Sequence, residues 1–411
     1  MNSGESKPRF LSNAGFSLYA GLDKSIYTLF AVRIINRFGD FVQMLLVLIL
    51  TVKLGMSDHE AGLFITFTII ATMVGQLTAG VVADKLARKY VLVFCQLMIC
   101  VSYLLCAVFI ESAFFSLVPL LILLGSPFRG ATHPITSSMV ADFSSESDRG
   151  RSFSLLYLGT NIGVALGPMA AAFLYARSLP LLFAGSSGLL LISTIVLWIK
   201  VPLLRSDVFI SASPKSEKGF VSVLFKNKIL LLFLLFFSIY NFTYAQNTFV
   251  LPLQFTEVFG VVAGAGNFGF LMTVNAVTVL FFTPILTRLT HRKSQLENMY
   301  LAMVFYVVGY GMYAFCSHFL AFLLATFIWT LGEILMATNA NVFLNAYAPP
   351  RYRARFNAVT NIAAGFGSAL APTVGGLLLV GESYEFLWSL MSFLCLVLGM
   401  GFFYLQRFLQ K

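Results

Sequence analysis

Residues 80–89 read Gly-Val-Val-Ala-Asp-Lys-Leu-Ala-Arg-Lys, and they separate two apolar runs at 61–83 and 90–109. Each run can supply the roughly 20 apolar residues with which an α-helix crosses a bilayer core of about 30 Å. A short loop with three basic residues between two such runs is typical of neighbouring membrane-spanning helices. This stretch therefore predicts a helical hairpin that crosses a membrane twice.

The composition of the whole chain agrees with a membrane protein. Of its 411 residues, 58% are hydrophobic and 11% are charged, whereas soluble domains have roughly 45–50% and about 25%. These values exclude a water-soluble domain, a disordered or collagen-like chain and a disulfide scaffold. The five cysteines lie in apolar runs without CxxC spacing, so we expect them to pack as small hydrophobic side chains and to bind no metal.

Ten further apolar runs satisfy the same length criterion, and we expect all twelve to be membrane-spanning helices. In the first half of the chain they lie at 26–52, 61–83, 90–109, 115–140, 153–176 and 179–201. In the second half they lie at 230–255, 263–289, 296–316, 319–346, 356–380 and 386–408. The polar stretch between the two sets falls at the middle of the chain.

The lysines and arginines predict the orientation. Of the 27, 22 fall in tails and loops on one side, two fall on the other side, and Arg33, Arg37 and Arg129 lie within helices. Because basic residues concentrate on the cytoplasmic side of a membrane, both termini are expected in the cytoplasm. The net charge of +10 then follows from topology, and we expect the lipid bilayer rather than nucleic acid as the partner.

The two halves of the chain are related by a constant offset of 204 residues. Arg88-Lys89 maps onto Arg292-Lys293, and Gly163 and Pro168 map onto Gly367 and Pro372. Both copies begin on the same side, since six helices separate them, so the repeats are parallel. We predict an all-α membrane protein of twelve helices in two pseudo-symmetric six-helix bundles, 1–201 and 229–411, joined by a cytoplasmic linker, 202–228.

The loop at 80–89 resembles the G-xxx-D-R/K-x-G-R-R/K signature of the major facilitator superfamily, with Ala87 in place of the second glycine. The resemblance implies a transporter that works by alternating access, in which this loop latches the two halves in the outward-facing state. The residues implied in the latch are Gly80, Asp84, Lys85, Arg88, Lys89 and Asp142. The alternative is a solvated loop that only sets topology.

The fifth helix reads Gly163-Val-Ala-Leu-Gly167-Pro168, which looks like the antiporter motif of the same superfamily. Small residues let helices approach closely, and proline removes an internal hydrogen bond. The resemblance implies a hinge at Gly163, Gly167 and Pro168, and it favours export. Simple close packing is the alternative. The segments around Asp40 and Glu333 look like those of the drug:proton antiporter branch.

Five charged side chains lie well within the predicted helices: Arg33, Arg37, Asp40, Arg129 and Glu333. A charge near the bilayer centre costs roughly 2.5–3.5 kcal/mol on insertion scales, so such groups usually face a cavity or a partner. We expect Arg33 to extend to the cytoplasmic edge. Asp40 lies three residues from Arg37 and is predicted to form a structural pair with it.

Arg129 and Glu333 are related by the 204-residue offset, so we expect both to face a central cleft at matching depth. Glu333 is the first candidate for a proton carrier and Asp40 the second. Burial raises the pKa of a carboxyl group and a neighbouring arginine lowers it, so a carboxylate that alternates between these environments can bind a proton on one side and release it on the other. A static ion pair is the alternative for Glu333. His133, one turn from Arg129, is interpreted as a packing histidine or as part of the site.

The substrate-binding candidates are polar side chains of both halves. They are Asn36, Arg37, Arg129 and His133 in the first half and Asn241, Tyr244 and Asn339 in the second. An aromatic cavity with one carboxylate suits lipophilic cations, whereas the five intramembrane charges sum to +1 and suit an anion. We therefore expect proton-coupled efflux of small lipophilic or amphipathic compounds, or else uptake or exchange of an anionic small metabolite.

An enzyme is not expected. The GxGxxG match at 264–269 lies at the end of a predicted helix without a preceding strand, and no nucleotide-binding Walker loop occurs. We expect no cofactor and no metal. The expected partners are a small-molecule substrate, protons and the bilayer of a bacterial inner membrane, with the chain acting as a monomer. A membrane receptor and a lipid scramblase are the alternatives outside transport.

Overall fold

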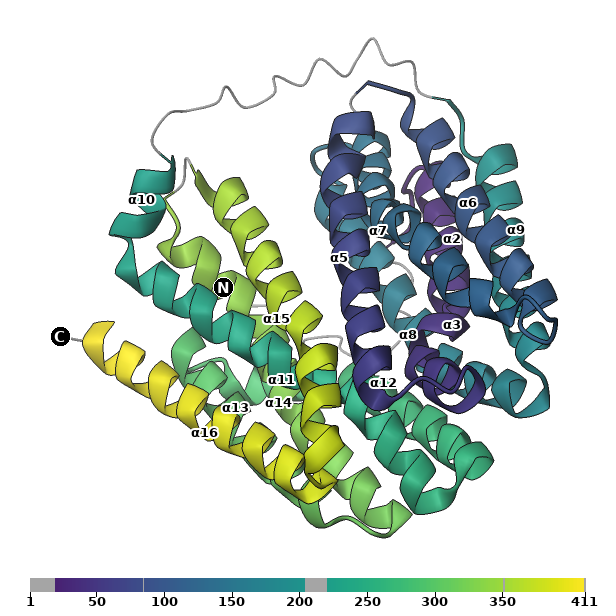
Figure 1. Ribbon diagram of the computed structural model, residues 1–411. Helices are drawn as coiled ribbons and strands as arrows, with labels where there is room; N and C mark the ends of the chain where they lie inside the picture. The colour runs from purple at the N-terminus through teal and green to yellow at the C-terminus, as the bar shows by residue number, and fades with distance from the viewer. Residues whose placement is uncertain (1–18, 84, 204–219, 350–351, 410–411) are drawn as a thin grey trace, which may run out of the picture.

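The computed structural model describes residues 19–83, 85–203, 220–349 and 352–409 (Figure 1). Within them lie twelve helical segments that are long and apolar enough to cross a membrane, the first of which is divided into several short helices. The first half comprises α2 (Lys24–Phe38), α3 (Phe41–Met44), α4 (Leu46–Leu48), α5 (Asp58–Ala83), α6 (Arg88–Phe109), α7 (Val118–Phe143), α8 (Arg149–Arg177) and α9 (Leu179–Lys200). The second comprises α11 (Lys228–Phe259), α12 (Val261–Thr290), α13 (Gln295–Phe315), α14 (Phe319–Tyr347), α15 (Arg353–Gly381) and α16 (Tyr384–Leu409). The predicted fold class is confirmed.

Most helices begin within a few residues of the predicted boundaries, and capping side chains explain several of the starts. The Ser178 side chain accepts a hydrogen bond from the Leu181 backbone at the start of α9. Ser294 and Glu297 form a capping box at the start of α13. Such caps satisfy backbone N–H groups that a helix leaves without partners in its first turn. A short helix, α10 (Phe220–Lys226), precedes α11 within the predicted linker.

The first membrane segment corrects a prediction, because it is not one continuous helix. α2 ends at Phe38, and the Gly39 backbone N–H closes it by donating to the Ile35 carbonyl oxygen. The chain then continues through α3, α4 and a π-helical turn at Ile49–Lys53. A Cβ on Gly39 would lie 3.0 Å from Leu189 of α9. The break therefore occurs at a residue that packs tightly against α9, and it leaves Asp40 outside a regular helix.

The two halves contact each other mainly through two helix pairs, α5 with α15 and α8 with α12. We call the end of the molecule at which α9 ends and α10 begins the linker side, and the opposite end the far side. The Thr66 hydroxyl donates to the Ala369 carbonyl oxygen at 2.6 Å, and Gly62 and Gly376 pack against opposing backbone near the far side. From this contact α5 and α15 diverge toward the linker side (Figure 1).

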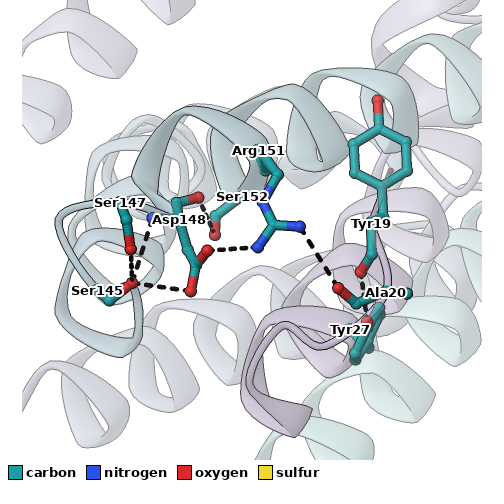
Figure 2. A network of polar contacts seen from close by, with 8 residues as sticks. All are labelled: Tyr19, Ala20, Tyr27, Ser145, Ser147, Asp148, Arg151 and Ser152. Atoms are coloured by element: carbon teal, nitrogen blue, oxygen red, sulfur yellow. Dashed lines mark hydrogen bonds and ion pairs between the residues drawn. The ribbon is translucent and has the colours of Figure 1, made fainter. Parts of the chain in front are cut away.

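The loop between α7 and α8 is tied to the segment that precedes α2 (Figure 2). Asp148 forms an ion pair with Arg151 and accepts a hydrogen bond from the Ser145 hydroxyl. Arg151 also donates to the Ala20 carbonyl oxygen at 3.4 Å. The Arg151 guanidinium, together with the Ser145 hydroxyl, holds the pKa of the Asp148 carboxyl below its ordinary value. The contacts connect the start of α8 to the chain entering α2.

Candidate functional site

A polar cavity of about 280 Å³ lies inside the first half, between α2, α5, α6 and α7. The charged side chains that line it are Arg33, Arg37, Asp40 and Arg129. Three guanidinium groups against one carboxylate give the cavity a positive formal charge. Asn36 and His133 also line it, together with Gln76 and several threonines. The structure thus brings together all four substrate-binding candidates of the first half.

Asp40 lies between two arginines in this cavity. Its Oδ2 atom is 3.4 Å from Nη1 of Arg129 and 3.9 Å from Nη1 of Arg37. Asp40, which was predicted to pair with Arg37, is therefore nearer to Arg129 of α7. Sequence spacing alone did not reveal this second partner. The break after Gly39 places Asp40 where it can reach both arginines. Neutralising Asp40 would leave two guanidinium groups facing the cavity without this counter-charge.

Two polar atoms of the cavity have no hydrogen-bond partner among the described residues although they are buried. They are Nε of Arg129 and Oδ1 of Asn36. A buried polar atom without a partner costs free energy, so a polar substrate group or water that reached them would be stabilised. A donor on Arg129 and an acceptor on Asn36 suit a ligand that carries both kinds of group.

The prediction that Arg33 extends to the membrane edge is wrong. The side chain is 7% exposed, lines the cavity, and donates from Nε to the Thr160 hydroxyl of α8 at 2.9 Å. Helix α8 covers it, a tertiary contact that a single-helix depth estimate does not include. His133 also differs from a packing histidine, because it is exposed and lines the same cavity.

The second half holds Glu333 in a different setting. The Tyr244 hydroxyl of α11 donates to Oε1 of Glu333 at 2.8 Å, and the Asn275 amide of α12 donates to Oε2 at 2.8 Å. The Asn275 amide also donates to the Thr330 hydroxyl at 2.9 Å. Within the described part of the chain Glu333 forms no salt bridge, so the static ion pair is not observed.

Asn275 is a site residue that the sequence analysis missed, as it missed Gln76 and Thr160 in the first half. Asn275 is 9% exposed and lies in an otherwise apolar stretch of α12. An amide in such a stretch costs free energy unless it is hydrogen-bonded. An asparagine within an apolar run therefore indicates a buried polar partner, and Asn275 could have been found in this way. Asn241 and Asn339, which were predicted to bind substrate, donate to carbonyl oxygens of their own helices, and their role in binding stays a prediction.

A second cavity, of about 270 Å³, lies between the two halves. Its lining includes Gln43 and Thr68 from the first half and Thr248 and Ser368 from the second. Arg129 lines both cavities. Arg129 therefore lies between the first cavity, which we call the arginine cavity after Arg33, Arg37 and Arg129, and the cavity at the boundary between the halves.

One residue pair implied for the latch is in contact, whereas the latch itself stays a prediction. Arg88 at the start of α6 donates to both carboxylate oxygens of Asp142 near the end of α7, as the resemblance implies. Lys89 donates to the Trp198 carbonyl oxygen at 2.8 Å, and Lys85 is exposed. Asp84 lies outside the described residues, and the Gly80 backbone is helical. These contacts all join parts of the first half.

The predicted hinge lies in an unbroken helix, since α8 continues through Pro168. A Cβ on Gly163 would lie 2.5 Å from Cβ of Arg37, and one on Gly167 would lie 3.2 Å from the Phe38 carbonyl oxygen. The glycines therefore permit close packing of α8 on α2, beside the break in the first segment. The Pro168 carbonyl oxygen faces Gly269 of α12 at the contact between the halves.

Comparison with known proteins agrees with this architecture. The family model described as the Major Facilitator Superfamily matches residues 29–372. The chain belongs to the major facilitator superfamily. YhjO of Bacillus subtilis, an uncharacterised transporter of this superfamily, is 24% identical to it over 80% of this chain and 79% of YhjO. An antiporter of Planococcus maritimus that exchanges Na⁺, Li⁺ and K⁺ for H⁺ is 21% identical over 76% of this chain and 80% of the antiporter.

The nucleoside transporter NupG has the same fold as this superfamily member. Its crystal structure aligns with a TM-score of 0.77 and 16% identity, over 93% of this chain and 99% of NupG. The protein is a multi-pass membrane transporter of the superfamily, and its family and relatives are transporters rather than enzymes.

Proposed function

We propose that this transporter exchanges protons for small lipophilic or amphipathic compounds and exports them by alternating access. The observation that carries the proposal is Glu333, a membrane-embedded carboxylate held by neutral donors on two other helices. Such a group can bind a proton without breaking an ion pair. Asp40 is the second proton site proposed, and its protonation would weaken its contacts with Arg129 and Arg37.

Antiport is supported by the relative from Planococcus maritimus, which exchanges alkali cations for protons. The asymmetry of basic residues supports a cytoplasmic linker side with both termini in the cytoplasm. On this assignment the structure corresponds to the inward-facing state, since the halves meet near the far side. The bundles 1–201 and 229–411, joined by the linker 202–228, would then move as two bodies. The Arg88–Asp142 contact would contribute to a latch in the opposite state.

A second candidate function is uptake or exchange of an anionic small metabolite. The lining of the arginine cavity favours it, because Arg33, Arg37 and Arg129 outnumber Asp40. Guanidinium groups bind carboxylate and phosphate oxygens through paired hydrogen bonds. In this case Arg129, which also lines the cavity between the halves, would hold the anion during transport.

Proteoliposomes with an imposed pH gradient test the first proposal. Addition of a lipophilic cation such as tetraphenylphosphonium should release protons across the membrane, recorded by an entrapped pH dye. Glu333→Gln should abolish this movement. The matched control is Glu382→Gln, which changes an exposed carboxylate near the far end of α15 and should leave it intact. Proton movement that persists in Glu333→Gln would reject the assigned role.

A thermal-unfolding screen separates the two candidate functions. Lipophilic cations and small dicarboxylates would be added to the purified protein in parallel. Stabilisation by dicarboxylates that disappears in Arg129→Gln would favour the anion transporter. Stabilisation by cations that persists in Arg129→Gln would favour the first proposal.

A further inference from the structure

Two cavities adjoin each other on the outer surface of the second half, between α13 and α16. One, of about 380 Å³, lies at the linker side, where α13 begins and α16 ends, and is lined by Lys293, Glu297, Gln406 and Arg407. The other, of about 220 Å³, is an apolar groove that continues along the same two helices. Tyr300 lines both cavities. A polar end followed by an apolar groove matches an amphiphile that stands parallel to the helices.

The polar end favours an anion. Lys293 and Arg407 are exposed cations there. The single acidic residue, Glu297, already accepts a hydrogen bond from the Ser294 backbone N–H at 2.7 Å, and the Gln406 side chain also hydrogen-bonds to it. Its charge is therefore engaged in capping α13. Lys293 also interacts electrostatically with Glu297, so two cations and one carboxylate leave the polar end with a net formal charge of +1 that attracts a negatively charged group at the membrane surface.

Aromatic side chains separate the polar end from the groove. The Arg407 guanidinium lies over the Phe403 ring, 4.9 Å from its centroid, and the Phe403 and Tyr300 rings are 5.7 Å apart. Arg407 is thereby held at the linker-side end of the groove. Aromatic rings at this level are typical of the interface between headgroups and hydrocarbon.

The groove spans most of the length of an acyl chain in one leaflet. It follows α13 from Tyr300 to Val308, which is about 12 Å at 1.5 Å per residue. One leaflet contributes about 15 Å to the hydrocarbon core. Gly399 brings α16 close to α13, because a Cβ there would lie 3.1 Å from Cβ of Met303. The lack of a side chain at Gly399 deepens the groove between Val304 and Met400.

We propose that this surface binds one anionic phospholipid, with its phosphate between Lys293 and Arg407 and one acyl chain in the groove from Tyr300 to Val308. The site lies on the outer surface of the second half and is separate from the arginine cavity and from Glu333. It does not depend on the identity of the transported substrate. Basic pockets between membrane helices at the cytoplasmic surface are known to bind phospholipid headgroups.

Native mass spectrometry of the full chain released from nanodiscs tests the site. Nanodiscs would contain either phosphatidylglycerol or phosphatidylcholine, each at the same protein-to-lipid ratio. The wild type should retain one phosphatidylglycerol and little phosphatidylcholine. The double variant Lys293→Gln/Arg407→Gln should lose retention about tenfold or more, the order expected for two basic residues near a headgroup. The matched control, Lys226→Gln/Lys228→Gln, removes two exposed charges at the linker side of the same half and should retain the lipid.

Further arms identify which part of the lipid is bound. Met400→Trp, which fills the groove at a residue that is 46% exposed, should reduce retention without changing the charge. Inorganic phosphate at millimolar concentration should not displace the lipid, because it lacks the acyl chain. Equal retention of the two lipids, or equal retention in the two charge variants, would overturn the proposal. Complete displacement by phosphate would indicate a site for free anions instead. Thermal unfolding of each variant in detergent checks that it is folded.

Discussion

A methyl group added at Gly62 should shift the transporter away from the state seen in this structure. Gly62 lies on α5 where it meets α15, and a Cβ there would be 2.2 Å from the Pro372 carbonyl oxygen and 2.8 Å from the Pro372 carbonyl carbon. Both obstacles are backbone atoms, so no side-chain rotation relieves the contact. Gly62→Ala therefore acts on the contact between the two halves.

The size of the effect follows from the distance. Ordinary contact begins near 3.4 Å, so α5 and α15 must separate by about 1 Å, and overpacking of this kind costs about 1–3 kcal/mol. The cost applies to the state in which the halves meet near the far side and is relieved when they separate there. An energy of this size changes the ratio of two states about 5- to 150-fold. Gly62→Ala should lower the ratio of the linker-side-open state to the linker-side-closed state by that factor.

Spin labels on the linker side provide the assay. Cysteines at Leu86 and Leu289 would carry the labels, since both residues are exposed and belong to opposite halves. The five native cysteines are buried, and they would be replaced first. Double electron–electron resonance in nanodiscs should show the long linker-side distance losing population to a shorter one in Gly62→Ala.

Two glycine variants serve as controls for Gly62→Ala. Gly266→Ala places a methyl group where nothing lies within 4 Å and should leave the distances unchanged. In Gly75→Ala the methyl group would lie 1.8 Å from the Pro127 carbonyl oxygen inside the first half, so it should lower stability without changing the ratio of states. An unchanged distance distribution in a folded Gly62→Ala protein would refute the reasoning. A shift of equal size in Gly75→Ala would do so too.

Three further predictions address other contacts. Asp40→Asn should lower the midpoint of thermal unfolding, because it removes the carboxylate between two guanidinium groups. In a double-mutant cycle, the further substitution Arg129→Leu should recover part of this loss. Asn275→Leu should cost about 1–3 kcal/mol of stability, since it deprives the Glu333 carboxylate of a donor, and denaturant titration against the wild type measures this; no loss would mean that the bond contributes nothing. Asp148, whose pKa is lowered chiefly by Arg151, should stabilise the fold above its unfolded-state pKa of about 3.9 and lose that contribution as pH falls through the lower folded value. Asp148→Asn should therefore make the midpoint of unfolding less sensitive to pH in the acid range, and an unchanged pH profile would contradict this.

The membrane-spanning segments could be predicted because few backbone conformations are stable in lipid. A segment in hydrocarbon must satisfy its own N–H and C=O groups, so length and apolar composition are nearly sufficient to place a helix. The predicted 319–346 and the observed Phe319–Tyr347 differ by one residue. The break at Gly39 was not predicted in this way: Gly39 packs against Leu189 of another helix, and length and apolar composition contain no information on such a contact.

The site was predicted less completely, for a related reason. Ionisable residues in apolar segments are visible in the sequence because they are costly there, so Arg33, Asp40, Arg129 and Glu333 were found. Their partners were not, since these lie on other helices. Arg33 binds Thr160 of α8, and Asp40 is nearer to Arg129 of α7 than to its sequence neighbour. Spacing along one helix describes which side chains share a face, but the facing helix decides which of them are paired.

The repeat relates Arg129 to Glu333, yet the structure places these two residues in different chemical settings. Arg129 lines an arginine cavity in the first half, and Glu333 is held by neutral donors in the second. No salt bridge joins them in the described structure. If Glu333 carries the proton and Arg129 binds the substrate, the proton and the substrate do not compete for one side chain. Coupling would then act through the contact between the halves, which lies beside Arg129 and includes Pro372. On this reasoning a variant at the contact, such as Gly62→Ala, should change the ratio of transport to proton movement even though it touches neither ionisable group.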